Sequence, residues 1–300
     1  MPLRANLVRS LALLALASNS TALAAQHAVR EGRPAERDAV IRLSIPAGFL
    51  RVTAWERDSI DVRGRLDGLA TSFLLGGSMS SLKGGVRTAA AGGAAGSADL
   101  DIHLPRDARV RIQSGAAEVE VTAAGGTVEV SGTSGRIRIA GLAEWITVET
   151  LDGNIELAAV AREGTVRSAD GTVVVRGVLD ALDASTVNGS LYVGMEGPIA
   201  RVRLETVSSE IAFKGRLTRE GRLNAETHGG DIELRLPPST GASFHLVSYG
   251  PGIRNEMVAP AAVRAGPAKG EWSFTTGDGA ATIDVRTFKG RVVLLPKAEE

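Results

Sequence analysis

The chain has 300 residues, with 34 basic and 34 acidic side chains, 44% hydrophobic residues and no cysteine. These proportions are typical of a globular protein. The absence of cysteine excludes disulfides, thiolate zinc sites, cysteine nucleophiles and a lipidated N-terminal cysteine. The balanced charge argues against nucleic acid as the main partner. Glycine is abundant, at 36 residues, and aromatic residues make up only 4%, which favours a turn-rich β protein over a helical bundle.

Residues 1–25 have the pattern of a secretory signal peptide. Arg4 and Arg9 come before a short apolar run at 10–17, and a small-x-small cleavage site, ALA, follows at 22–24. A buried N-terminal helix is the alternative. The apolar run is shorter than the ~20 residues that span a bilayer, and no later segment is long enough. We therefore expect cleavage near Ala24/Ala25, a periplasmic or extracellular location, and no transmembrane segment in the mature chain.

The next two segments differ from the rest of the chain. Ala39–Pro46 and Leu50–Arg63 alternate apolar and polar residues as strands do, so we assign residues 26–66 to N-terminal strands that cap the fold. Residues 67–98 contain three Gly-Gly pairs among alanine and serine, and glycine at this density weakens regular structure. We expect a flexible excursion or a long hairpin there. A phosphate-binding loop would need a Lys-Ser/Thr ending, which is absent.

We assign residues 99–295 to a β-solenoid with a C-terminal cap, because from Val128 to Leu234 the sequence repeats itself every 18 to 21 residues. The repeat is marked by a turn residue: Gly135, Gly153, Gly171, Gly189, Ser209 and Gly230. Apolar residues recur two and four positions after each marker, and five and seven positions before it, with Gly164 as the exception. The first of these columns holds Ile137, Ile155, Val173, Leu191, Ile211 and Ile232. The positions between the apolar columns are mostly polar.

This alternation predicts strands with one buried and one wet face. Each repeat is then a strand, a tight turn such as Asp170-Gly171, and a second strand. Because one such unit cannot bury its own apolar face, the units must stack. We predict an all-β, single-domain β-solenoid of short ~18–21-residue rungs with atypical N- and C-terminal capping strands. A β-sandwich of hairpins is the alternative, but it gives no reason for a fixed period.

Two further columns belong to the predicted turn. A serine or threonine lies three residues before most markers, as in Thr150, Ser168 and Thr186. Stacked hydroxyl groups at that point can bond to each other or to the backbone of the bend. The register then breaks at Pro237-Pro238, and Thr287–Val292 repeats the turn motif once more. We expect the last strands to close the stack, and residues 296–300 to form a solvated tail.

Several segments together resemble a known family. They are Trp55–Gly64 (WERDSIDVRG), Asp99–Pro105 (DLDIHLP), the iterated V-x-V-x-T-x-x-G-x-I-x-L units and Thr287–Val292. In this order they are similar to the bacterial putative-adhesin β-solenoid family, a domain of unknown function in exported or membrane-tethered envelope proteins. The resemblance covers residues 39–295. It implies an envelope protein without known enzymatic activity, and it carries over no catalytic residue and no cofactor.

Few residues form a pattern that points to chemistry. Asp152 and Asp170 occupy equivalent corners one repeat apart, so their carboxylates could lie ~5 Å apart and bind calcium or act in glycan cleavage. Two Asp-Gly turns kept for backbone geometry are the simpler interpretation. Tyr192 lies in an outward column, where its ring could stack on a sugar. We expect no catalytic site, no metal and no cofactor.

The sequence thus favours a non-enzymatic, exported module that acts in adhesion, binding or envelope structure. Its partner would be an envelope protein or a polysaccharide, held on a rigid surface of repeated polar columns. One alternative is a carbohydrate-active enzyme, a polysaccharide lyase or hydrolase on a β-helical stack, although such enzymes cluster several acids on one face. A second alternative is an envelope stress-sensing domain.

Overall fold

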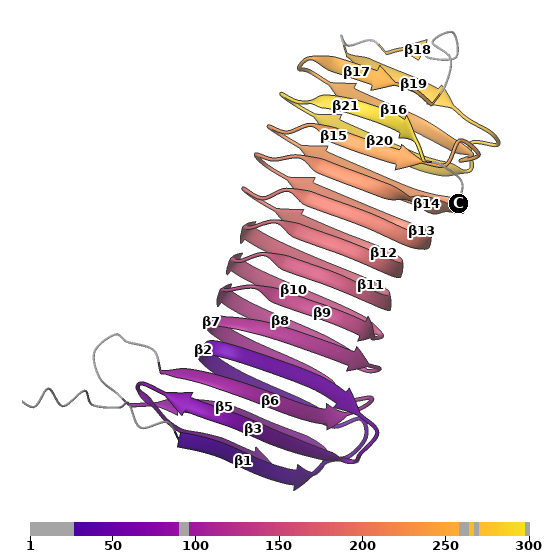
Figure 1. Cartoon of the computed structure of the whole chain (residues 1–300). Coiled ribbons are helices and arrows are strands. Elements are labelled where there is room, and N and C mark those ends of the chain that lie inside the picture. Colours follow the sequence, from indigo (N-terminus) through magenta and orange to yellow (C-terminus); the bar gives the residue numbers. More distant parts are fainter. Residues whose placement is uncertain (1–26, 90–95, 258–263, 267–269, 298–300) are drawn as a thin grey trace, which may run out of the picture.

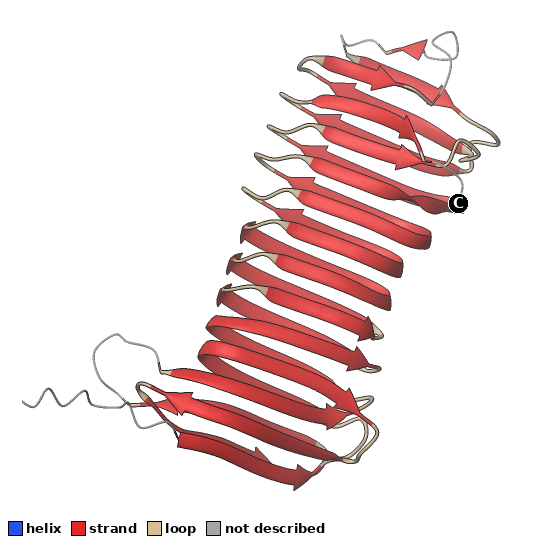
Figure 2. Ribbon diagram, viewed as in Figure 1, coloured by secondary structure: helices blue, strands red, loops and turns tan. Residues whose placement is uncertain are grey.

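The computed structural model describes residues 27–89, 96–257, 264–266 and 270–297. The expected signal peptide at 1–25 and the last three residues of the expected tail lie outside these ranges. The described residues form an elongated stack of strands that contains no helix (Figures 1 and 2). The all-β class predicted from the sequence is confirmed.

The described part of the chain forms twenty-one strands. The N-terminal strands are β1 (His27–Pro34), β2 (Val40–Trp55), β3 (Ser59–Asp67), β4 (Ala70–Gly77), β5 (Ser81–Thr88) and β6 (Ser97–Pro105). The central strands are β7 (Arg109–Ala124), β8 (Thr127–Ser134), β9 (Ile137–Leu142), β10 (Trp145–Asp152), β11 (Ile155–Asp170), β12 (Val173–Thr186), β13 (Leu191–Thr206) and β14 (Ile211–Thr227). The C-terminal strands are β15 (Ile232–Leu236), β16 (Ala242–Ser248), β17 (Gly252–Asn255), β18 (Arg264–Ala265), β19 (Glu271–Thr275), β20 (Ala281–Thr287) and β21 (Arg291–Pro296).

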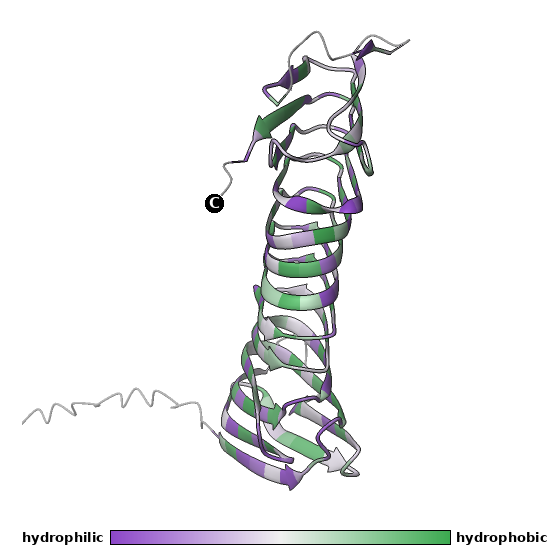
Figure 3. Ribbon diagram, turned by 90° about the vertical axis from the view of Figure 1, so that its right-hand side faces the viewer, coloured by the Kyte–Doolittle hydropathy of each residue, from purple (hydrophilic) through white to green (hydrophobic). Residues whose placement is uncertain are grey.

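The central strands pair in parallel with the next repeat of the sequence. Ile155 lies opposite Ile137 on one side and opposite Val173 on the other. The long strand β11 takes part in two layers, because its first half pairs with β9 and its second half with β10. We call one full passage through both layers a coil. Successive coils lie side by side along a narrow stack (Figure 3).

Five of these strands form a closed ring of parallel pairings. Strand β7 pairs with β8, β8 with β10, β10 with β11, β11 with β9, and β9 with β7. The ring closes because β7 and β11 are each 16 residues long and contribute to both layers. The remaining edges of β7 and β11 pair with β2 and β12, so the stack continues on both sides of the ring.

The apolar columns predicted from the sequence face inward and form the core. Ile137, Ile155 and Val173 are at most 1% exposed and follow one another across the coils. The exception in the pattern has a packing reason. A side chain at Gly164 would meet the buried Leu179, which fills the space that a larger residue would occupy.

The N-terminal end departs from the order of the sequence. Strand β2, which we expected to lie in a cap outside the repeat, pairs in parallel with β7 along its length. On its other side it pairs in parallel with β5 and β6. The segment in which we expected a flexible excursion or a hairpin contains the antiparallel β4–β5 hairpin. Strands β3 and β1 then continue the stack in antiparallel pairings.

The C-terminal end shows a corresponding departure. Strand β20 pairs in parallel with β14 and with β16, and β21 pairs with β15 and with β17. The last strands therefore insert between two earlier coils, whereas the sequence led us to expect them to close the stack. The end is instead covered by β16, β19 and β18, which pair in antiparallel.

Candidate binding surface

One corner of the stack carries a column of buried hydroxyl groups. All eight buried polar residues among the described ones belong to it: Ser114, Thr150, Ser168, Thr186, Thr206, Thr227, Thr287 and Ser248. They occupy the serine and threonine column that the sequence predicts at the turn. A buried hydroxyl must find a hydrogen-bond partner, or it destabilises the fold by its lost hydration.

These hydroxyl groups connect each corner to the preceding one. The Thr227 hydroxyl donates a hydrogen bond to the Ser209 carbonyl (3.1 Å) and accepts one from the Gly230 amide (3.2 Å). The Thr287 hydroxyl repeats the pattern with the Gly230 carbonyl (2.9 Å) and the Gly290 amide (3.0 Å). The hydroxyl column thus fixes the corner backbone and sets the position of the residue that follows each threonine.

The column is interrupted at Gly132. This glycine lies between Ser114 and Thr150 in the ladder, and a side chain there would meet both hydroxyl groups. Ser114 Oγ and Thr150 Oγ1 are buried and have no hydrogen-bond partner among the described residues. Thr150 therefore lacks the two bonds that Thr227 makes at the equivalent place.

Next to the hydroxyl column, five exposed side chains form what we call the ridge: Val187, Val207, His228, Phe288 and Tyr249. The four hydrophobic members are 45–56% exposed, and His228 is also exposed. Each follows a buried hydroxyl residue, and those residues lie opposite one another in consecutive coils. A contiguous row of exposed apolar side chains is a feature of interaction sites rather than of ordinary surface.

The aromatic members of the ridge stack on each other. The His228 and Phe288 rings are nearly parallel, with centroids 4.9 Å apart, and the Tyr249 ring lies 5.5 Å from Phe288 at an angle of 52°. His228 therefore covers one face of the Phe288 ring, and the Tyr249 ring lies next to Phe288 at an angle. Phe288 remains 52% exposed, so the cluster of rings still offers apolar surface to a partner.

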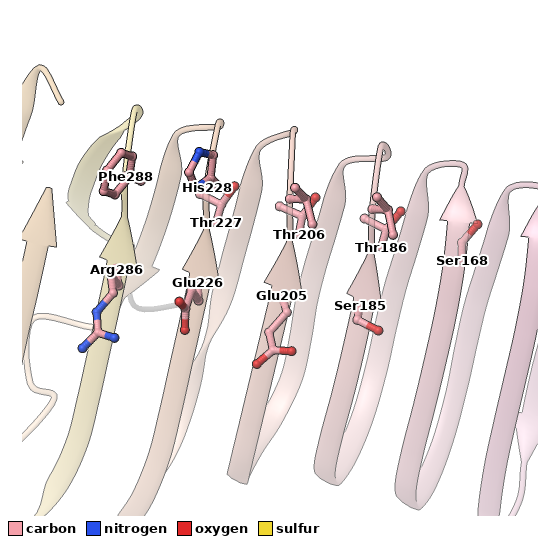
Figure 4. A pocket seen from close by; sticks show the side chains of 12 residues that line it. Ser168, Ser185, Thr186, Glu205, Thr206, Glu226, Thr227, His228, Arg286 and Phe288 are labelled. Carbon is pink, nitrogen blue, oxygen red and sulfur yellow. The ribbon is translucent and has the colours of Figure 1, made fainter. Parts of the chain in front are cut away.

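A polar column on the other side of the hydroxyl groups completes the surface. It contains Ser185, Glu205, Glu226 and Arg286, which lie beside the hydroxyl column as Figure 4 shows. This polar column and all members of the ridge except Tyr249 line a groove of about 490 Å³. Glu205 forms an ion pair with Arg203 (2.6 Å), whereas neither Glu226 nor Arg286 forms one with any described residue. The groove therefore has an apolar wall and a charged wall.

Asp152 and Asp170 lie opposite each other in neighbouring coils, at the corner where the sequence places them. The Asp170 carboxylate accepts a hydrogen bond from the Asn188 side chain (2.6 Å). Asn188 in turn accepts one from the Ser208 hydroxyl (3.2 Å). These bonds tie successive corners together. Within the described ranges, no three histidine or acidic residues converge as metal ligands would.

Tyr192 lies on the outer face of the other layer, opposite Val174 and Ala212. Its hydroxyl donates a hydrogen bond to the Glu210 carboxylate. This bond raises the pKa of Tyr192, because losing the proton would place two negative charges side by side. The aromatic side chains of the ridge lie elsewhere, so the structure does not bring Tyr192 into the groove.

Sequence reasoning missed the ridge, although the signal was present. The sequence pattern gave no role to the residue after each serine or threonine, yet Leu151, Val187 and Val207 are all apolar there. An apolar residue repeated at a turn position has no role in the core. His228, which follows Thr227 at the same position, is a member of the same row.

Comparisons with known proteins give structural likeness alone. The sequence matches no family, and no curated protein resembles it. The chain is similar to a putative cell adhesion protein from Clostridium sporogenes, with 10% identity, a TM-score of 0.26, and coverage of 90% of this chain and 100% of that one. It is also similar to a putative adhesin from Bacteroides fragilis, with 12% identity, a TM-score of 0.47, and coverage of 90% and 97%. Over the described residues, no helix has the length and apolar character to cross a membrane.

Proposed function

We propose that this chain is a non-enzymatic, adhesin-like binding module built as a β-solenoid. In this proposal the signal peptide is removed near Ala24/Ala25, and the mature protein acts in the periplasm or outside the cell. The parallel pairing of successive repeats supports the solenoid assignment. The N-terminal residue pattern supports export.

The observation that carries the proposal is the ridge beside its groove. Five exposed side chains in consecutive coils offer a partner a long apolar edge, with charged groups parallel to it. A stack fixed by its hydroxyl column holds this edge rigid, so little conformational entropy is lost on binding. We assign the partner-binding surface to the ridge rather than to Tyr192 or to the Asp152 corner.

The test compares matched variants on immobilised partners. The mature protein is passed over an array of bacterial and plant glycans and over a surface that carries the same protein, and both retention and product release are measured. In the ridge variant, Val207→Ser/Phe288→Ser, the apolar edge is lost. The control, Leu142→Ser/Val160→Ser, removes two residues that are 48% and 47% exposed and lie opposite each other at the other corner.

We expect wild type and control to be retained on at least one surface without product release, and the ridge variant to lose that retention. Release of a cleaved glycan would contradict the proposal in favour of an enzyme. Equal retention of the ridge variant, or no retention of wild type on any surface, would also contradict it.

A further inference from the structure

The distance between neighbouring ridge residues restricts which kinds of partner can contact every coil of the ridge. Neighbouring coils are one strand spacing apart, ~4.8 Å. An α-helix repeats every ~5.4 Å, so it would move out of step by about 0.6 Å at each coil. An extended peptide presents one face every ~6.6 Å and loses register after a single coil. A second stack of strands has the same spacing and stays in register throughout.

The surface can also meet a copy of itself about a twofold axis. The ridge projects from the corner, and the groove lies directly beside it, between Phe288 and Arg286. A twofold symmetric interface uses one patch on both copies, so that residue i meets residue j and j meets i. When two copies lie antiparallel about an axis along the strands, the ridge of one copy meets the ridge of the other, and the two polar columns also face each other.

The charged residues of the groove are also arranged so that two copies of the chain could pair. Glu226 and Arg286 lie opposite each other on β14 and β20, yet neither has an ion-pair partner among the described residues. Figure 4 shows the two side chains on neighbouring strands, pointing away from His228 and Phe288. If a second copy runs antiparallel, with the twofold axis between these two strands, Glu226 of each copy faces Arg286 of the other.

We infer that the ridge is a homotypic interface, in which two copies of this chain lie antiparallel and the ridge of each packs against the ridge of the other. His228 of one copy then packs against Phe288 of the second copy, and the two Glu226–Arg286 pairs lie on either side of the axis. The inference rests on the proposed function in one respect, since it takes the ridge as the binding surface. It adds the identity of the partner.

The test exchanges the two charges. Glu226→Arg alone places two arginines against each other across the interface, and Arg286→Glu alone places two glutamates there. Each single variant should weaken the dimer about 30-fold or more, because like charges are brought together twice. In an equimolar mixture, a copy of one variant can bind a copy of the other. Only in such a heterodimer does residue 226 of each copy face an opposite charge at residue 286 of its partner. Sedimentation velocity over a concentration series, with one variant fluorescently labelled, measures the dissociation constants.

We expect wild type and the Leu142→Ser/Val160→Ser control to dimerise alike, both single variants to be monomeric at the same concentration, and their mixture to form a heterodimer within about tenfold of wild-type affinity. Thermal melting by circular dichroism checks that each variant is folded, because each exchange also places two like charges side by side within one chain. If a single variant fails to fold, Val207→Ser/Phe288→Ser replaces it as the monomeric form.

Three results would overturn the inference: a monomeric wild type at every concentration, single variants that dimerise like wild type, or a mixture of folded variants that stays monomeric. These are distinguishable from failure of the proposed function. A wild type that is monomeric but is retained on a glycan through its ridge would keep the proposed function and remove the homotypic partner.

Discussion

At the scale of single residues, the most informative positions are the buried hydroxyl groups. Thr227 and Thr150 occupy the same column, with 2% and 6% exposure, but only Thr227 has hydrogen-bond partners. The two residues thus separate the effect of burial from the effect of hydrogen bonding within one protein. The sequence could predict the column and its bonds to the backbone, but Gly132 gave no sign that it leaves two hydroxyl groups without partners.

We predict that Thr227→Val destabilises the protein by about 1–3 kcal/mol, because it leaves the partly buried Ser209 carbonyl and Gly230 amide without their shared partner. Thr150→Val, which has nearly the same shape and removes no bond, should change the free energy of unfolding by less than about 0.5 kcal/mol. Urea denaturation of both variants measures the difference. Equal losses would show that the hydroxyl bonds contribute nothing.

A second prediction at this scale concerns Tyr192. Its hydrogen bond to Glu210 raises its pKa, so the phenol should ionise at a higher pH than a free tyrosine. Any stabilisation from this bond is present below the ordinary tyrosine pKa and is lost as the pH rises through the raised value. Ultraviolet titration in a Tyr249→Phe background follows Tyr192 alone, since the chain has two tyrosines. Glu210→Gln should bring the pKa back down, and an unchanged titration would contradict the contact.

At the scale of elements, the alternation of each strand decides which face is buried. On β11, Ile155 points into the core with 0% exposure, and Ala158 points outward, opposite Arg176 on β12. The sequence predicted these faces because the columns repeat six times. It could not predict that Arg138 on β9 contacts Glu118, Glu120 and Glu156 at once, since such a network depends on side chains from three coils.

We predict that Ile155→Asp leaves the chain unfolded or aggregated, because an unpaired buried carboxylate destabilises a fold by several kcal/mol. Ala158→Asp, three residues further along the same strand, should melt within about 3 °C of wild type, because it places the carboxylate in solvent near Arg176. Soluble yield and thermal melting check both. Similar damage from the two variants would contradict the assigned faces.

At the scale of the whole molecule, the two ends of the stack share one arrangement, which the sequence repeat alone does not predict. Strand β2 at the beginning and strands β20 and β21 at the end both lie inside the stack. Antiparallel strands lie beyond them, with β1 and β3 at one end and β18 and β19 at the other. The Thr287–Val292 motif identified the last coil as a repeat, but its neighbours are chosen by tertiary packing. For this reason the order of the coils was predictable in the middle and not at either end.

The inserted position of the last strands has a measurable consequence. Amide hydrogens of β20 and β21 should exchange as slowly as those of β12, although they belong to the end of the chain, because each strand is paired on both sides. Strand β1, which pairs only with β3 among the described strands, should exchange faster. Hydrogen–deuterium exchange with mass spectrometry resolves these segments. Rapid exchange of β20 would contradict the insertion.

The account depends most on the register in which successive coils lie side by side, and a cysteine-free chain allows that register to be measured directly. Glu156 and Val174 are partners on neighbouring strands, at the ~4.8 Å separation that a disulfide can bridge, while Tyr192 lies one coil further away. Under mild oxidation, Glu156→Cys/Val174→Cys should form an intramolecular disulfide nearly completely, and Glu156→Cys/Tyr192→Cys should not. Equal cross-linking of the two pairs, or of neither, would contradict the stack and everything inferred from it.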